Sequence, residues 1–238
     1  MAESSGSGST FEANEALTDP GYRAAVVDLL GVISYGEISA FERLAEDAKL
    51  APTMQDKLAL GTMASVELTK VSALHERITQ LGADPFEVME PFRVAIDSFH
   101  RHTAPSDWLE GLVKAFVGDG LANDFYREIA AFLDPQTRDL VVASLDDDGG
   151  HAAFVVGRVR QVIAADPTVG GRLALWGRRL MGEALTQAQR VAADRDSLTS
   201  LLTGSVDRPG LDLAALGRMF TRLTDRHLER MGELGLDA

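Results

Sequence analysis

The 238-residue sequence contains no cysteine, which excludes disulfides, thiolate catalysis and cysteine-ligated zinc or iron–sulfur centres. Any metal ion would have to be held by carboxylate and imidazole groups. No stretch reaches the roughly 18 uninterrupted apolar residues that a membrane span needs. The start of the chain also has neither the basic nor the apolar region of a signal peptide. We therefore expect a cytoplasmic protein with no membrane partner.

Basic residues are scarce, because 23 Lys and Arg stand against 36 Asp and Glu, for a net charge of -13. An acidic surface repels phosphate backbones, so nucleic acid is not the default partner. Segment 157–195 is the exception, with seven arginines and three acids. If tRNA binds, we expect it to bind to this segment. The favoured interpretation is that these arginines pair with acidic residues in the rest of the chain.

What is present indicates an all-α fold. Hydrophobic residues make up 45% of the chain and charged residues 25%, which is typical of a globular domain. Residues 1–18 begin MAESSGSGST and read as a flexible tail, and residues 19–238 as a single helical domain. Apolar residues recur at spacings of three and four, and pairs such as Asp19-Pro20 mark helix starts. The predicted helices span 20–50, 53–81, 85–101, 106–133, 135–164, 168–203 and 211–235.

Four of these helices are long, at about 28 to 31 residues or about 42–46 Å each. The short turns between them pair 20–50 with 53–81 and 106–133 with 135–164, which predicts a four-helix bundle. The two C-terminal helices are expected to pack outside this bundle or to form a homodimer interface.

Each bundle helix carries one acid on its apolar stripe, and one acid is followed by a histidine three residues later. An ionised carboxylate in a dry core must be paired, protonated or bound to a metal. Counted from the hairpin turns, the acids lie at similar depths. Their convergence would form a carboxylate-bridged two-metal centre. The predicted ligands are Glu37, Glu67, Asp119, Asp148 and His151.

The two predicted hairpins also resemble each other at an offset of 82 residues, which aligns Gly36 with Gly118 and Glu37 with Asp119. Such a repeat is typical of a bundle with pseudo-twofold symmetry about a central site. Glycines inside a helix cost about 1 kcal/mol each against alanine. Their presence beside the acids suggests that room is needed there for a metal, oxygen or substrate. The glycines concerned are Gly118, Gly120, Gly149 and Gly150.

Several stretches resemble the ferritin-like superfamily, and more closely its actinobacterial MiaE-like branch, named for a tRNA hydroxylase. They are YGEISAFERLAEDA, APSDWLEGLVKAFVGDG, DFYREIA and LALWGRRLMGEALTQAQRVAADRD. The resemblance covers residues 21–236. It implies a non-haem di-iron protein that uses iron and dioxygen to hydroxylate a tRNA or a small organic substrate.

In that family each half of the bundle supplies a Glu on one helix and an ExxH motif on the next. By this resemblance Glu37 and Asp119 take the places of the lone acids. Asp148 and His151 form a DxxH motif in place of the second ExxH, and Glu67 opens the first. Lys70, however, stands in the slot of the first histidine, and a protonated lysine cannot ligate a metal.

Three alternatives to a di-iron hydroxylase stay open. The acids could lie on helix flanks and bond to arginines. Lys70 could neutralise them in a metal-free scaffold or binding protein, through a buried ion-pair network. Iron storage is a third alternative, and it requires a large cage. His100 lacks a partner at ligand spacing and is predicted to be structural or solvated.

Overall fold

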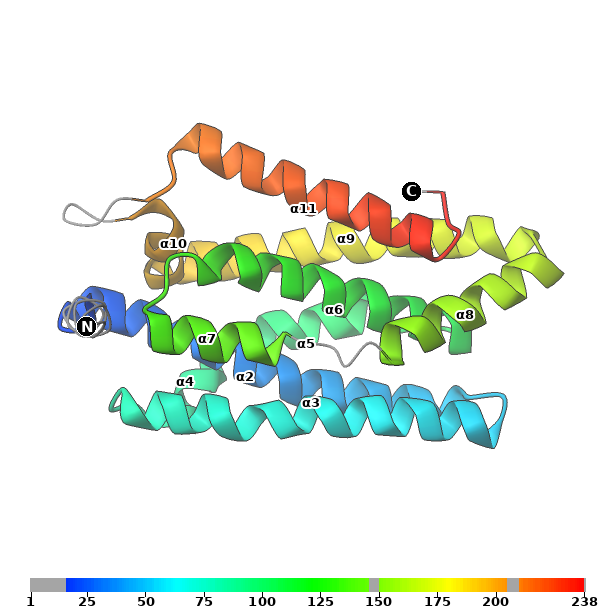
Figure 1. The fold of residues 1–238 in the computed structure, drawn as a ribbon, viewed down its shortest axis with the longest axis horizontal. Helices are drawn as coiled ribbons and strands as arrows, with labels where there is room; N and C mark the ends of the chain where they lie inside the picture. The colour runs from blue at the N-terminus through cyan, green and yellow to red at the C-terminus, as the bar shows by residue number, and fades with distance from the viewer. Residues whose placement is uncertain (1–15, 146–149, 205–209, 238) are drawn as a thin grey trace, which may run out of the picture.

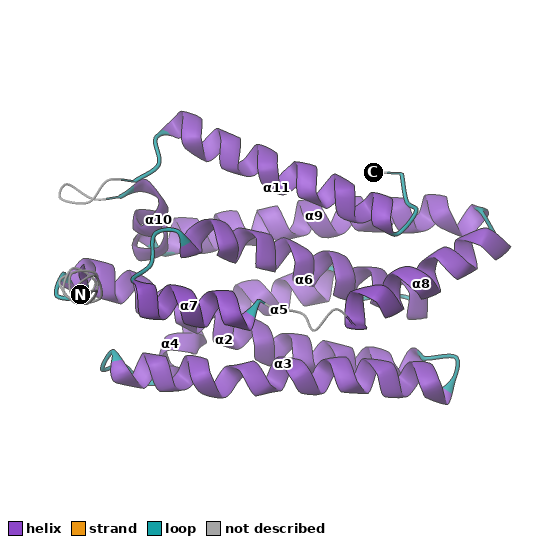
Figure 2. Ribbon diagram, viewed as in Figure 1, coloured by secondary structure: helices purple, strands orange, loops and turns teal. Residues whose placement is uncertain are grey.

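The computed structural model describes residues 16–145, 150–204 and 210–237, and all the regular structure in these ranges is helical (Figures 1 and 2). The predicted all-α class is therefore confirmed. The helices are α2 (Pro20–Asp47), η1 (Ala48–Leu50), α3 (Met54–Gln80), α4 (Pro85–Met89), η2 (Glu90–Phe92), α5 (Arg93–His102), α6 (Trp108–Ala130), α7 (Pro135–Ser144), α8 (Gly150–Ala165), α9 (Thr168–Asp194), α10 (Asp196–Thr203) and α11 (Leu213–Glu233).

Side-chain caps fix where the bundle helices begin. The Asp19 carboxylate accepts a hydrogen bond from the Gly21 amide at 2.9 Å, ahead of α2. The Thr53 hydroxyl accepts one from the Asp56 amide at 3.1 Å, ahead of α3. Asp134 caps α7 in the same way. These groups satisfy amides that have no partner inside the helix, which is why the starts were predictable from sequence.

The predicted hairpins are present. Helices α2 and α3 pack along their lengths, α6 packs against α7 and α8, and α7 also contacts α3. Figure 1 shows α9 and α11 lying over the opposite side of α6, outside the bundle. Leu112, Val113 and Val117 on α6 are fully buried between these layers. Helix α6 is therefore the shared element that joins the bundle to the C-terminal helices.

Three predicted helices are interrupted. The helix expected over 135–164 is described as two helices, α7, which ends at Ser144 with Leu145 as its C-cap, and α8, which begins at Gly150; residues 146–149 lie outside the described residues. The helix expected over 85–101 is divided at η2, where Pro91 lacks a backbone donor. The helix expected over 168–203 is broken at Arg195, whose backbone is extended at φ -136° and ψ 84°. No glycine or proline signalled that last break.

Residues 20–50 are long and apolar enough to cross a membrane by length and composition alone. In the structure half of the most apolar window is buried, and α2 packs on α3, α4, α5 and α10. A core helix of a folded bundle passes the same test of length and composition.

Candidate carboxylate and lysine site

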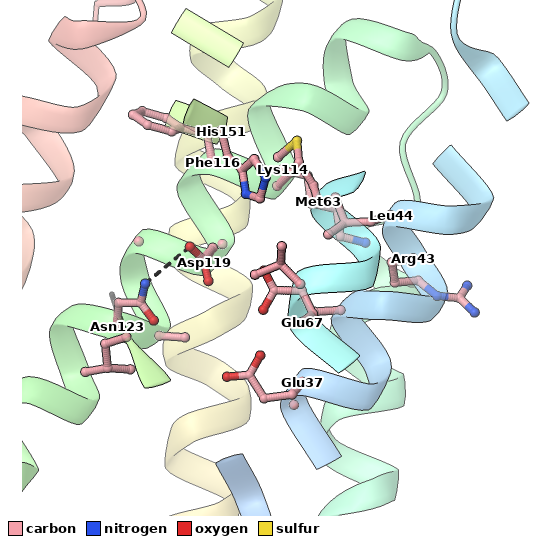
Figure 3. Close-up of a pocket in the computed structure, with 18 of the residues that line it drawn as sticks. Glu37, Arg43, Leu44, Met63, Glu67, Lys114, Phe116, Asp119, Asn123 and His151 are labelled. Carbon is pink, nitrogen blue, oxygen red and sulfur yellow. Dashed lines mark hydrogen bonds between the residues drawn. The ribbon is translucent and has the colours of Figure 1, made fainter. Parts of the chain in front are cut away.

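A cavity of about 530 Å³ lies among the bundle helices, with walls formed by α2, α3, α5, α6 and α8. Glu37, Glu67, Lys70, Asp119 and His151 all line it. Figure 3 shows the carboxylates of Glu37, Glu67 and Asp119 facing a common space, with the His151 ring beside them. The fold thus brings these predicted residues together from four helices. The remaining predicted ligand, Asp148, lies outside the described residues.

The Lys70 ammonium occupies the centre of the acidic pair. Its Nζ donates a hydrogen bond to Glu67 Oε2 at 2.6 Å and lies 3.5 Å from Glu37 Oε2. Glu37 is 9% exposed and Glu67 is 8% exposed, so both carboxyl groups are buried as the stripe pattern predicted. The buried ion-pair network proposed for Lys70 is present.

The carboxyl groups of Glu37 and Glu67 share a proton beside Lys70. Burial, a hydrogen bond with Glu67 and the charges of Glu67 and Asp119 raise the pKa of Glu37 to about 10, against the attraction of Lys70. Burial also opposes the charge of Glu67, but hydrogen bonds from Glu37 and Lys70 hold the pKa of Glu67 below its ordinary value. At neutral pH the two glutamates therefore share one proton beside a charged Lys70.

Asp119 and His151 differ from the two glutamates. Asp119 is solvent-exposed, contrary to the burial that its place on the stripe predicted, and it accepts a hydrogen bond from Asn123 Nδ2 at 3.2 Å (Figure 3). His151 is half-buried and acts electrostatically on Glu67. The acid on α6 thus lies at the open side of the cavity, where water stabilises its charge.

The described residues do not fit a pair of iron ions. Among residues 16–145, 150–204 and 210–237, no group of three or more His, Asp or Glu side chains is placed to hold a metal. Lys70 lies where a metal bridging Glu37 and Glu67 would bind, and its ammonium has no lone pair to donate. Its positive charge also opposes a second cation there.

The glycines of α6 serve two different purposes. A Cβ atom built on Gly118 would meet no atom within 4 Å, so this residue does leave open space in the cavity wall. A Cβ atom on Gly120 would overlap the Arg230 guanidinium, which donates to the Gly120 carbonyl at 3.1 Å and to Asp124 at 2.6 Å. Gly120 therefore makes room for an arginine of α11, which corrects the prediction of substrate space at that position.

Two arginines of segment 157–195 pair with acids, as the favoured interpretation expected. Arg158 forms a bidentate pair with buried Asp56, with Nε at 2.8 Å from Oδ1. Arg172 pairs with Asp107 and Glu110 near the start of α6. These pairs tie α8 to α3 and α9 to α6.

Another part of the same cavity was not predictable from the sequence. Lys114, Asp47 and His100 line it. Burial foremost, together with the charges of Lys114 and Arg43, lowers the pKa of His100 to about 3. No helical spacing marked Lys114 as an interior residue, because a lysine in an amphipathic pattern ordinarily lies at the surface.

The fold and the site together define a ferritin-like helical bundle that carries acids on its inner helix faces. The chain belongs to the family described as "Ferritin-like domain, actinomycetes", whose model matches residues 20–205. A search of the curated proteins found no match to this chain.

Proposed function

We propose that this ferritin-like protein binds a small organic molecule in its central cavity without a metal ion, and that Lys70 supplies the positive charge that a metal would otherwise bring. The carrying observation is the contact of Lys70 Nζ with Glu67 at 2.6 Å and its 3.5 Å separation from Glu37. One ammonium thereby compensates a carboxyl pair that shares a proton.

The cavity supports a binding role. Its volume of about 530 Å³ lies in the usual range for small-molecule sites. Apolar side chains such as Leu44, Met63 and Phe116 supply much of its wall, and the polar groups include Lys70 with its glutamates and Lys114 with Asp47. This chemistry suits a mainly apolar molecule that carries a hydrogen-bonding group.

Iron-dependent hydroxylation of a tRNA or small organic substrate is the competing proposal, and it rests on the family resemblance. It would require Lys70 to leave the Glu37 and Glu67 carboxylates before two ferrous ions could bind. Cytoplasmic location and a homodimer stay predictions under both proposals.

Metal content separates the two proposals. We expect protein purified from metal-replete cells to contain well below one metal ion per chain by plasma mass spectrometry. Lys70→His restores an ExxH motif and should increase iron uptake on anaerobic loading. Lys70→Met removes the ammonium without adding a ligand and is the matched control. Native protein that retains about two irons per chain would support the hydroxylase and overturn our proposal.

A cavity-filling variant tests the binding role. Gly118→Leu should weaken binding of the neutral fluorescent probe N-phenyl-1-naphthylamine by at least about tenfold, because its side chain extends into open space in the cavity wall. Gly61→Leu is the control, since Gly61 is an exposed residue of α3 with equally open surroundings. Equal probe affinity in both variants would show that the probe binds elsewhere.

A further inference from the structure

A buried lysine at the far end of the cavity has no hydrogen-bond acceptor. Lys114 of α6 is 5% exposed and lines the cavity, and its Nζ has no partner among the described residues (Figure 3). Its contact is instead with the Phe99 ring, whose centroid lies 5.7 Å from Nζ. A buried ammonium left without an acceptor loses most of its solvation.

The surroundings of Lys114 increase the fraction of its amine that is neutral. Burial and the charge of Arg43 lower the pKa of Lys114 to about 8, against the opposing charges of Asp47 and Glu46. At pH 7 about a tenth of such an amine is neutral, whereas an ordinary lysine of pKa about 10.4 is less than about one thousandth neutral. The sequence contains no cysteine, so a neutral amine is the strongest nucleophile available to this cavity.

An acid lies close to the amine. A Cβ atom built on Gly111 would lie 3.3 Å from Asp47 Oδ2, which places the Asp47 carboxyl group against α6 one helical turn before Lys114. Burial raises the pKa of Asp47 above its ordinary value despite the attraction of Lys114. Asp47 is therefore suited to give and take a proton beside the amine.

We propose that Lys114 captures a small, mainly apolar aldehyde as an imine. The nitrogen lone pair attacks the carbonyl carbon, the C=O electron pair moves to oxygen, and a proton passes from nitrogen to oxygen to give a carbinolamine. Asp47 then protonates the hydroxyl, which leaves as water while the C=N bond forms. The nitrogen returns its proton to Asp47. One amine and one aldehyde give one imine and one water, with no change of oxidation state.

Apolar walls set the class of aldehyde. Leu44 and Phe99 line the cavity near Lys114, so an alkyl or aryl aldehyde should be favoured over a polyhydroxylated one. This proposal does not rest on the metal-free function, because labelling of Lys114 is read independently of metal content.

Reductive trapping tests the proposal on the full-length native protein. Butanal and sodium cyanoborohydride at pH 7 convert an imine into a stable secondary amine, which peptide mapping locates. The sequence has four lysines, and exposed Lys49 and Lys57 serve as internal references. We expect Lys114 to be labelled at least about tenfold faster than either. Glyceraldehyde should label it more slowly than butanal.

Denaturant provides the fold control, because the preference for Lys114 should vanish when the chain is unfolded. Lys114→Met and Lys114→Arg should remove the fast label and keep the far-ultraviolet circular dichroism spectrum of the native protein. Faster labelling of Lys49 and Lys57 than of Lys114 in the native protein would overturn the proposal. So would a native preference for Lys114 that persists unchanged in denaturant.

Discussion

The cavity is lined by two buried lysines, and the pKa values of these two lysines shift in opposite directions. Burial disfavours the charge of both. At Lys70 the carboxyl groups of Glu37 and Glu67 outweigh that cost and raise the pKa of the amine. At Lys114 no carboxylate lies within hydrogen-bond distance among the described residues, and burial prevails. The nearest acceptors, and not depth alone, decide whether the pKa of a buried lysine rises or falls.

This contrast also separates the two roles we assign. Lys70 is held by ion pairs that would resist a change in the occupancy of the cavity. Lys114 is bound only by packing and by the Phe99 ring, so a ligand can contact it without breaking a hydrogen bond.

The largest expected effect is on stability when each lysine is replaced by methionine. Lys70→Met leaves the glutamate pair without the ammonium that compensates its charge and should lower the free energy of unfolding by about 3 kcal/mol at pH 7. Lys114→Met removes an unpaired buried cation and should be neutral or stabilising. Urea denaturation followed by circular dichroism measures both changes. A larger loss of stability for Lys114→Met than for Lys70→Met would show that Lys70 is not the lysine that stabilises the fold through ion pairs.

The free energy of unfolding, measured over a series of pH values, tests whether Glu37 holds a proton in the folded protein. The pKa of Glu37 is about 10 in the folded protein and near the ordinary 4.5 in the unfolded chain. Between pH 5 and 8 the unfolded chain therefore binds fewer protons at this residue, so its contribution to stability falls as pH rises. Glu37→Gln keeps a neutral hydrogen-bond donor and removes this titration. We expect the free energy of unfolding of the variant, relative to that of the native protein, to increase by at least about 1 kcal/mol from pH 5 to pH 8.

The difference between the two unfolding curves isolates Glu37, because the other titrating groups are present in both proteins. A difference that stays flat across this range would show that Glu37 is ionised in the folded state.

The smallest effect is expected at the open side of the site. Asp119 is exposed and its charge is solvated, so Asp119→Asn should change the free energy of unfolding by no more than about 0.5 kcal/mol at pH 7. Thermal and urea unfolding check this. A loss comparable to that of Lys70→Met would mean that Asp119 belongs to the buried ion-pair network.

Much of the fold could be predicted from the sequence, because the signals that start and stop helices are local. The Asp-Pro pairs at Asp19, Asp84 and Asp134 act through side chains that bond amides two or three residues away. The positions of Glu37 and Glu67 on apolar stripes placed them correctly in the interior. Lys70 was recognisable as a departure from the ExxH motif of the family that the chain resembles, because it stands three residues after Glu67, where that motif has a histidine.

Other features could not be predicted from the sequence. Asp119 has the same spacing as the buried acids, yet its helix is turned so that the side chain reaches water. The break at Arg195 has no glycine or proline to announce it. Gly120 looked like a residue that makes room for substrate, and only the approach of Arg230 from α11 shows what fills that space.

The sequence alone determined the helical class, the starts of the main helices, the lack of thiol chemistry and the presence of acids and a lysine at one level of a bundle. These follow from side-chain type and from spacing within one helix. The tertiary structure decided which lysine is paired, which acid is solvated and that both lysines line one cavity. Those outcomes depend on how helices distant in the chain face one another, because burial and charge pairing are set across the helix interfaces.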